Sequence, residues 1–199
     1  MKRISVVMPT ITGREEMWAW ITPLYAERAP GFEIELCCPK DYPNWPSGIN
    51  AARPTGDYRL YTADDLEPLA GWADAMVACL DRGQVPAPQV WNWTKEGPPV
   101  NEGQDGPPGS IPAFSRIPAL TRAMAEAIGP WPPELDYYAD NWCSDIARLK
   151  GWETRVTEGF GFIHHWNQTG RLDAGDWQGR NVPKYNARRA ALGLAPVPR

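Results

Sequence analysis

Residues 56–65 read Gly56-Asp57-Tyr58-Arg59-Leu60-Tyr61-Thr62-Ala63-Asp64-Asp65, a strand-like run that ends at two adjacent carboxylates and leads into a helical pattern. Two acidic side chains at the carboxyl end of a strand can bind Mg²⁺ or Mn²⁺ through oxygen, and the ion in turn neutralises phosphate charge. This edge suits a metal-bound diphosphate and indicates nucleotide chemistry. The alternative is that Asp64 or Asp65 caps free amides of a helix that starts near Pro68.

The N-terminus follows a similar plan of strand, loop and helix. Residues 4–9 are a short apolar strand and the proline that breaks it, and the loop then leads through Arg14 into a helix. Thr12 and Glu15 have the spacing of a capping box. Pro23 is expected to limit how far this helix runs.

Strands and helices continue to alternate along the chain. Apolar residues alternate with glutamates over residues 32–37, which predicts a half-buried strand near a sheet edge. The further predicted elements are a short helix at 47–52, helices through 69–80, 117–128, 142–149 and 184–194, and strands at 89–93 and 154–166. This order predicts an α/β fold with a largely parallel sheet and a ligand crevice at the carboxyl ends of its strands. Residues 95–112, rich in Gly and Pro, are a disordered loop or a mobile lid, and we favour the lid.

Composition narrows the class of protein further. A chain of 199 residues that is 43% hydrophobic is expected to form one domain, residues 1–199. It has no apolar run long enough to span a membrane and no signal-peptide pattern, so we expect a cytoplasmic protein. Its four cysteines lack Cys-x-x-Cys spacing and are expected to be reduced thiols. A net charge of −4 disfavours a nucleic-acid partner without excluding one, since a local basic patch around Lys184, Arg188 and Arg189 stays open.

Four features in their order resemble the GT-A-fold glycosyltransferases, in particular the large inverting family of bacterial and viral nucleotide-sugar transferases. They are Val6-Val7-Met8-Pro9-Thr10, the run from Gly56 to Ala63-Asp64-Asp65, Ala139-Asp140 placed eleven residues before Gly151-Trp152, and His164 at the end of a late strand. The resemblance spans residues 6–165. It implies a single Rossmann-like domain whose residues 1–90 bind a nucleotide sugar and whose residues 91–199 hold the acceptor and the catalytic group.

The resemblance also implies a donor and metal site. Asp65 would bind Mn²⁺ or Mg²⁺, and Asp64 would contact the ribose or the metal's water shell, whereas Ala63 stands where the family's first acid is usual. The donor, a UDP-sugar, would be held by residues spread over three segments: Pro9, Thr10 and Arg14 in the first loop, Asp41 after the second strand, and Asn50 in the short helix. Arg14 is alternatively a surface charge.

A metal-binding histidine is usual in the family at the end of the late strand. His164 and His165 are adjacent there, and successive side chains of a strand point to opposite faces, so at most one should reach the metal. His164 fits the family position better, and a structural histidine is the alternative.

Asp140 matches the family's general base, which would deprotonate the acceptor hydroxyl as it attacks the anomeric carbon. The preceding residue, Ala139, departs from the acid that is common there, and the alternative role of Asp140 is an N-cap. Asp145 is a reserve candidate, but five residues further along a helix it faces a direction about 140° away.

The sequence therefore favours a metal-dependent glycosyltransferase that transfers a sugar to a hydroxyl acceptor with inversion. Two alternatives are a sugar-phosphate nucleotidyltransferase and a non-catalytic carbohydrate-binding protein. The single glycine in residues 9–13 disfavours the first, because such enzymes carry a Gly-rich loop there. Asp64, Asp65 and Asp140 argue against the second.

Overall fold

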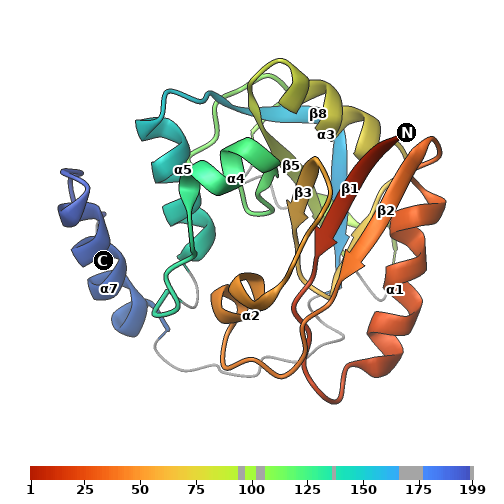
Figure 1. Cartoon of the computed structure of the whole chain (residues 1–199), viewed down its shortest axis with the longest axis horizontal. Helices are drawn as coiled ribbons and strands as arrows, with labels where there is room; N and C mark the ends of the chain where they lie inside the picture. The colour runs from red at the N-terminus through yellow and green to blue at the C-terminus, as the bar shows by residue number, and fades with distance from the viewer. Residues whose placement is uncertain (94–96, 102–105, 136–137, 166–176, 198–199) are drawn as a thin grey trace.

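Helices surround two four-stranded β-sheets in this chain (Figure 1). The computed structural model describes residues 1–93, 97–101, 106–135, 138–165 and 177–197. The strands are β1 (Lys2–Val7), β2 (Phe32–Cys37), β3 (Tyr58–Tyr61), β4 (Leu66–Pro68), β5 (Val85–Asn92), β6 (Val100–Asn101), β7 (Ala119–Thr121) and β8 (Thr154–His164). The helices are α1 (Glu15–Glu27), α2 (Trp45–Ala51), α3 (Trp72–Asp81), α4 (Arg122–Ile128), α5 (Ala139–Leu149) and α7 (Trp177–Ala191). The α/β class predicted from the sequence is confirmed.

The first sheet has the strand order β2-β1-β3-β7. β1 pairs in parallel with both β2 and β3, so that Val6 lies opposite Leu36 and Leu60, while β7 is antiparallel to β3. α1 makes the crossover that parallel pairing of β1 and β2 requires. β2 is an edge strand, as its alternating sequence predicts. The carboxyl ends of β1, β2 and β3 consequently lie together.

The second sheet has the order β4-β8-β5-β6, in which β8 is parallel to β5 and antiparallel to β4. The short strand β4, absent from the sequence expectation, follows Asp65 directly and pairs Leu66 with His164. This pairing places the acidic edge of the first sheet beside the end of β8.

The core between sheets and helices contains several large aromatic side chains among aliphatic ones. Trp72 on α3 is fully buried and meets Tyr25 of α1 edge-on, with ring centroids 5.5 Å apart. Trp131 and Trp142 are also buried, whereas Trp20 is 45% exposed. All four cysteines are free thiols, as predicted. Within the part of the chain that is described, no helix has the length and apolarity needed to cross a bilayer.

Predictions for the first helix and for the acidic edge differ from the structure. The N-cap of α1 is Arg14, and no capping box forms, because Thr12 donates its amide and hydroxyl to Asp41 instead. Pro23 lies inside α1, which continues for four further residues, since one missing amide donor does not outweigh the packing of the helix on the sheet. The helix after the acidic edge begins only at Trp72, so neither Asp64 nor Asp65 caps it.

Later boundaries also differ. Residues 119–121, predicted as helix, form β7 on the open edge of β3, and α4 begins at Arg122. α7 begins at Trp177, earlier than the predicted residue 184, and contains Pro183. Residues 100–101 of the predicted lid form β6, paired with β5, and residues 94–96 and 102–105 lie outside the described residues, as does the last predicted residue of the late strand, 166.

Candidate active site

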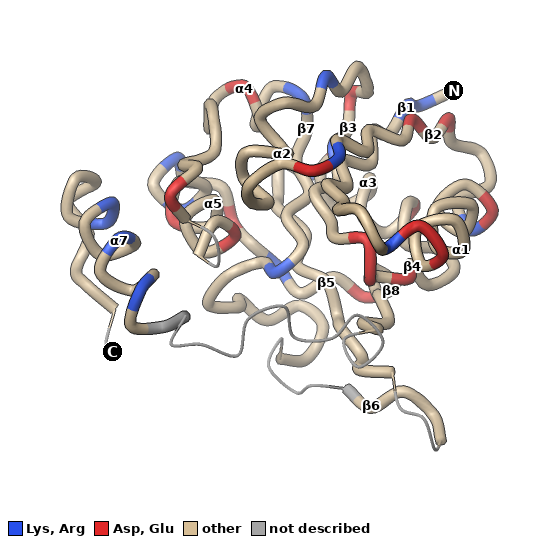
Figure 2. Tube along the Cα trace, turned by 90° about the horizontal axis from the view of Figure 1, so that it is seen from below, with Lys and Arg blue, Asp and Glu red and all other residues tan. Residues whose placement is uncertain are grey.

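The loops that follow β1 and β3 meet the end of β8 at one edge of the molecule. The Thr62 amide donates to the carbonyl of Val7 at 3.0 Å, which ties the start of the acidic loop to the end of β1. α5 runs antiparallel to β1, so its N-terminal turn lies toward this edge (Figure 1). Figure 2 looks onto the edge and shows acidic residues gathered where α1, β4 and β8 approach one another.

Asp64 is a buried anchor for the loop between β1 and α1. Its side chain is 3% exposed, with one oxygen accepting from the Thr10 hydroxyl at 2.6 Å and the other from Arg14 Nη1 at 2.5 Å. Both oxygens of Asp64 are therefore engaged by residues of that loop. The predicted donor residues Thr10 and Arg14 are brought to the acidic edge by this contact.

Asp65 and His164 form the second pair at the edge. His164 Nε2 lies 3.7 Å from Asp65 Oδ2, and Arg14 Nη1 lies 3.9 Å from the same oxygen. The backbone fixes this geometry, because the His165 amide donates to the Asp65 carbonyl at 2.9 Å beside the ladder pair of Leu66 and His164. Burial opposes ionisation of Asp65, but the hydrogen bond and charge of His164 and the charge of Arg14 outweigh it and hold the pKa of the carboxyl below its usual range.

His165 points to the opposite face of β8, as expected for adjacent strand residues. It is 1% exposed, and its Nε2 lies 2.8 Å from Glu67, which pairs with Arg28 at 2.7 Å. Trp20 of α1 covers it edge-on at a centroid distance of 4.8 Å. The structure thus places His165 in a packed ion-pair network and His164 at the acidic edge.

The residues at this edge fit a divalent ion as a partial ligand set. A carboxylate oxygen and an imidazole nitrogen are ligands that Mn²⁺ accepts, and two ligands at about 2.1 Å from one ion can be 3.7 Å apart. Over the described ranges, no group of three His, Cys, Asp or Glu side chains is placed to hold a metal. Asp65 and His164 would therefore share an ion whose other ligands are water or phosphate oxygens, the usual arrangement for ions bound with nucleotides.

A cavity of about 180 Å³ opens at the β1–α1 loop, whose Thr10 binds Asp64. It is lined by Thr10, Ile11, Glu15, Trp18, Cys38 and Lys40. Lys40 Nζ pairs with Glu15 at 2.9 Å on its rim. Of these residues, only Thr10 was predicted as a donor-binding residue. Trp18 was detectable as the residue one turn after Arg14 on the same helical face.

Asp41 and Asn50, two further predicted donor residues, are engaged in holding local structure. Asp41, in a left-handed conformation at φ 58°, accepts from the amide of Thr12 at 2.7 Å and so joins the end of β2 to the β1–α1 loop. Asn50 of α2 exchanges two hydrogen bonds with the backbone of Trp131, at 2.7 and 2.8 Å. Pro9 packs against α2, where a Cβ on Gly48 would approach Pro9 Cβ to 2.7 Å.

Asp140 lies in the first turn of α5. The N-cap of this helix is Tyr138, so the capping alternative for Asp140 is wrong, although Asp140 does accept from the amide of Asn141 at 2.8 Å. Burial raises the pKa of the Asp140 carboxyl to about 7, while the amide of Asn141 and the charge of Arg116 oppose the rise. A carboxyl with a pKa near neutrality is suited to accept a proton in a reaction.

Asp145 faces α7 instead. It is 2% exposed and accepts from Tyr185 at 2.6 Å, from Arg189 at 2.5 Å and from Arg148 at 3.1 Å. Arg188 likewise pairs with Glu134. Arg188 and Arg189, two members of the suspected basic patch, are thus committed to ion pairs within the chain.

No protein-family model matches this chain, and no curated protein matches it. Solved structures do match. The catalytic domain of Drosophila beta1,4galactosyltransferase 7, in complex with xylobiose, has a TM-score of 0.63 at 14% sequence identity, covering 88% of this chain and 76% of that one.

Two further matches carry a bound nucleotide. S. aureus TarS 1-349 in complex with UDP has a TM-score of 0.60 at 12% identity, covering 96% of this chain and 72% of that one. A mutant of the Drosophila enzyme in complex with manganese, UDP-Gal and xylobiose has a TM-score of 0.56 at 14% identity, covering 90% of this chain and 79% of that one. This chain has the GT-A fold.

The GT-A fold accounts for how the predicted site residues are distributed. Thr10, Arg14, Asp64, Asp65 and His164 meet at one edge, because they follow strands whose ends lie together. The other predicted residues lie in the packed structure around it: Pro9 and Asn50 at α2, Asp41 at the end of β2, His165 behind β8, and Asp145 between α5 and α7.

Proposed function

We propose that this chain is a metal-dependent glycosyltransferase that transfers a sugar from a UDP-sugar to a hydroxyl acceptor with inversion at the anomeric carbon. The observation that carries the proposal is the pair of Asp65 and His164, 3.7 Å apart, beside Arg14 and an adjoining cavity on a GT-A fold. The pair offers metal ligands, Arg14 offers positive charge, and the cavity offers room for a nucleobase. Together these are the parts that a nucleoside diphosphate sugar needs.

The cavity would hold the uracil ring. Trp18 and Ile11 give it apolar walls, which suit the faces of a planar base, and the Glu15–Lys40 ion pair gives it a polar rim. The loop that carries Ile11 is held by Asp64 and by Asp41, so the base would bind to a largely preformed site.

The diphosphate would lie between this cavity and the Asp65–His164 pair. A divalent ion held by that pair would offset the negative charge that develops on the departing diphosphate. Arg14, whose side chain is 20% exposed at the same edge, would add a second positive charge. Asp64 would position Arg14 and Thr10, because both of its oxygens bind them.

Asp140 would act as the general base. Its carboxylate takes the proton of the acceptor hydroxyl while that oxygen bonds to the anomeric carbon from the face opposite the leaving group. The bond between that carbon and the diphosphate oxygen breaks, and its electron pair stays on the diphosphate. A pKa of about 7 lets Asp140 be ionised at neutral pH and still accept a proton.

The two halves of the chain would divide this work. Residues 1–90 contain the cavity, Asp64 and Asp65 and would bind the donor; residues 91–199 contain Asp140 and would place the acceptor. The positions of α4 and α5 beside the first sheet support this division (Figure 1).

Calorimetric titration of UDP with Mn²⁺ present, and again with the metal chelated, tests the proposal. We expect binding that requires Mn²⁺, and hydrolysis or transfer from a UDP-sugar in a subsequent screen of donors. Asp65→Asn should remove the metal dependence of binding, while Asp74→Asn, at an acidic position on the far helix α3, should leave it unchanged. No UDP binding in either condition would refute the uridine-donor assignment.

A further inference from the structure

Arg14 contacts both acidic residues of the candidate active site. Its Nη1 lies 2.5 Å from Asp64 Oδ1 and 3.9 Å from Asp65 Oδ2, and its side chain is 20% exposed. Most of the guanidinium is thus enclosed against the carboxylates. In this arrangement one protein cation already balances part of the charge that a metal ion would balance.

A divalent ion on Asp65 and His164 would lie close to this guanidinium. Asp65 Oδ2 is 3.7 Å from His164 Nε2 and 3.9 Å from Arg14 Nη1, so the ion and Arg14 would approach the same oxygen. Like charges at such separation repel strongly where water is partly excluded. Metal binding in the absence of a nucleotide is therefore opposed by Arg14.

A bound diphosphate changes this balance. Its oxygens can complete the coordination of an ion that has only two ligands from the described residues, and they offer the guanidinium a bidentate partner. Asp64 stays in place if Arg14 moves, because its other oxygen is held by the Thr10 hydroxyl at 2.6 Å. The β1–α1 loop then keeps its anchor while the arginine changes partner.

We propose that Arg14 couples metal binding to donor binding: it occupies the acidic pair when the crevice is empty and turns to the diphosphate when metal and nucleotide bind together. The inference rests on the proposed function and extends it from a static donor contact to an exchange of partners. Its consequence is that Mn²⁺ binds weakly alone and tightly with UDP. Since coupling is reciprocal, Mn²⁺ strengthens UDP binding by the same factor.

Electron paramagnetic resonance of Mn²⁺ titrated into the protein measures metal affinity without turnover. For the wild type we expect UDP to tighten Mn²⁺ binding by about tenfold or more, after correction for the Mn²⁺–UDP complex in solution. Arg14→Gln should bind Mn²⁺ alone about fivefold more tightly than the wild type, with the tightening by UDP reduced to about twofold or less. Arg14→Lys keeps the positive charge but lacks the paired N–H donors of the guanidinium. Its Mn²⁺ affinity and the tightening by UDP should lie between those of the wild type and of Arg14→Gln.

The matched control is Lys2→Gln, which removes one positive charge at the opposite end of β1, where Lys2 pairs with Asp81. It should change neither Mn²⁺ affinity nor the coupling. Disruption of the loop would weaken Mn²⁺ binding, so tighter binding in Arg14→Gln is a result that a purely structural role of Arg14 does not produce.

The outcomes separate the two proposals. Metal-dependent UDP binding with equal coupling in the wild type and Arg14→Gln overturns the role of Arg14 and leaves the donor site standing. If the wild type binds UDP equally well with and without Mn²⁺, the proposed exchange of partners by Arg14 is also refuted. Arg14 would then take the place of the metal ion in binding the diphosphate. Absence of UDP binding overturns the proposed function itself.

Discussion

Replacement of Asp140 by asparagine should slow catalysis and stabilise the protein at alkaline pH. Burial raises the pKa of Asp140 from 3.8 to about 7, so the folded chain holds this proton more tightly than the unfolded chain. The free energy of unfolding therefore falls as pH rises from about 4 to about 7, and the loss is complete above pH 7. An amide at this position has no proton to lose and escapes the penalty.

The size of the effect follows from the difference between the two pKa values. About three pH units at about 1.4 kcal/mol each give an upper limit of about 4 kcal/mol. Asp140 remains partly accessible to solvent, which reduces the penalty, and we expect about 2 kcal/mol at pH 8. For a chain of this length that corresponds to a rise in melting temperature of roughly 4–8 °C.

Thermal unfolding at pH 8 and at pH 5, together with donor turnover, checks both parts of the prediction. Asp140→Asn should lower kcat by about 10²- to 10⁴-fold while UDP affinity stays within about twofold. Wild-type activity should rise with pH through about 7. At pH 5 the gain in stability should be less than half of that at pH 8. An equal gain at both pH values would refute the role of burial, and an unchanged kcat would refute the role of Asp140 as the base.

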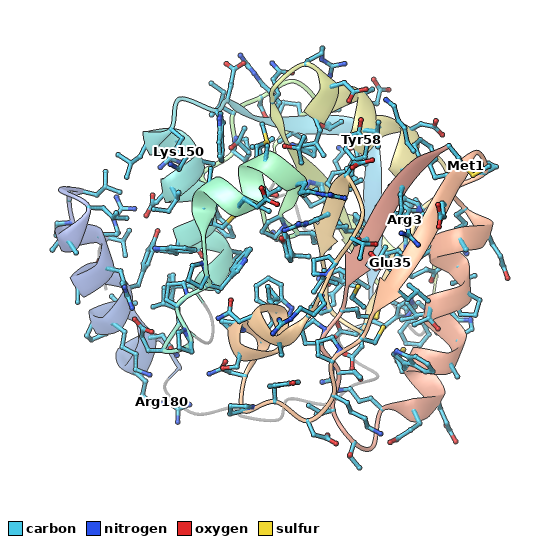
Figure 3. All side chains as sticks on the ribbon, viewed as in Figure 1. Met1, Arg3, Glu35, Tyr58, Lys150 and Arg180 are labelled. Carbon is cyan, nitrogen blue, oxygen red and sulfur yellow. The ribbon has the colours of Figure 1, made fainter. Side chains whose placement is uncertain are left out.

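Three further perturbations test the site and its supports. Gly48→Ala should weaken UDP binding by about tenfold, because its Cβ would lie 2.7 Å from Pro9 Cβ and displace the β1–α1 loop; normal UDP affinity, measured by calorimetry, would show that the loop tolerates the shift. UDP with Mn²⁺ should protect Cys38, which lines the cavity, from alkylation, while Cys37 outside it serves as the control in peptide mass spectrometry; equal modification with and without nucleotide would place the base elsewhere. Glu35 of β2 is labelled in Figure 3. It accepts from the amide and hydroxyl of Thr55, each at 2.7 Å; burial alone would raise the pKa of its carboxyl, but the hydrogen bonds lower it to about 2. Glu35→Gln should therefore lower the free energy of unfolding by about 1 kcal/mol at pH 7. In denaturant unfolding this difference from the wild type should disappear as pH falls from about 4.5 to about 2, and a difference that persists at pH 2 would contradict the stabilising role of the ionised Glu35 carboxylate.

The part of the candidate site that lies at the carboxyl ends of strands could be predicted from the sequence. Asp64 and Asp65 follow one apolar strand and the β1–α1 loop follows another, and these two parallel strands end together. The placing of Arg14 and His164 at the site came from the resemblance to the GT-A glycosyltransferases. Trp18 was missed although it lies one helical turn after Arg14, and Cys38 was missed because a cavity depends on how α1 is rotated against the end of β2. That rotation is set by packing, which no local pattern encodes.

The predicted helix and strand boundaries were wrong where hydrogen bonds to a segment distant in the sequence determined the backbone conformation. Residues 66–68 became a strand because β8 offers hydrogen-bonding groups to them, and residues 119–121 because β3 has an open edge. Thr12 and Glu15 had capping-box spacing, yet Asp41, brought alongside by β2, took the Thr12 donors. Local propensities are worth less than one such tertiary hydrogen bond.

The sequence by itself determined the α/β order of elements and the acidic edge, since hydrophobic periodicity and the position of charged residues at strand ends are local properties. The tertiary structure decided which partners the charged residues have. Asp64 is held by Thr10 and Arg14, His165 by Glu67 and Asp145 by Arg189, whereas Asp65 and His164 face each other at the crevice. The reason is that hydrogen bonds and ion pairs depend on distance in space, and the residues joined by these contacts are 44 to 99 positions apart in the chain.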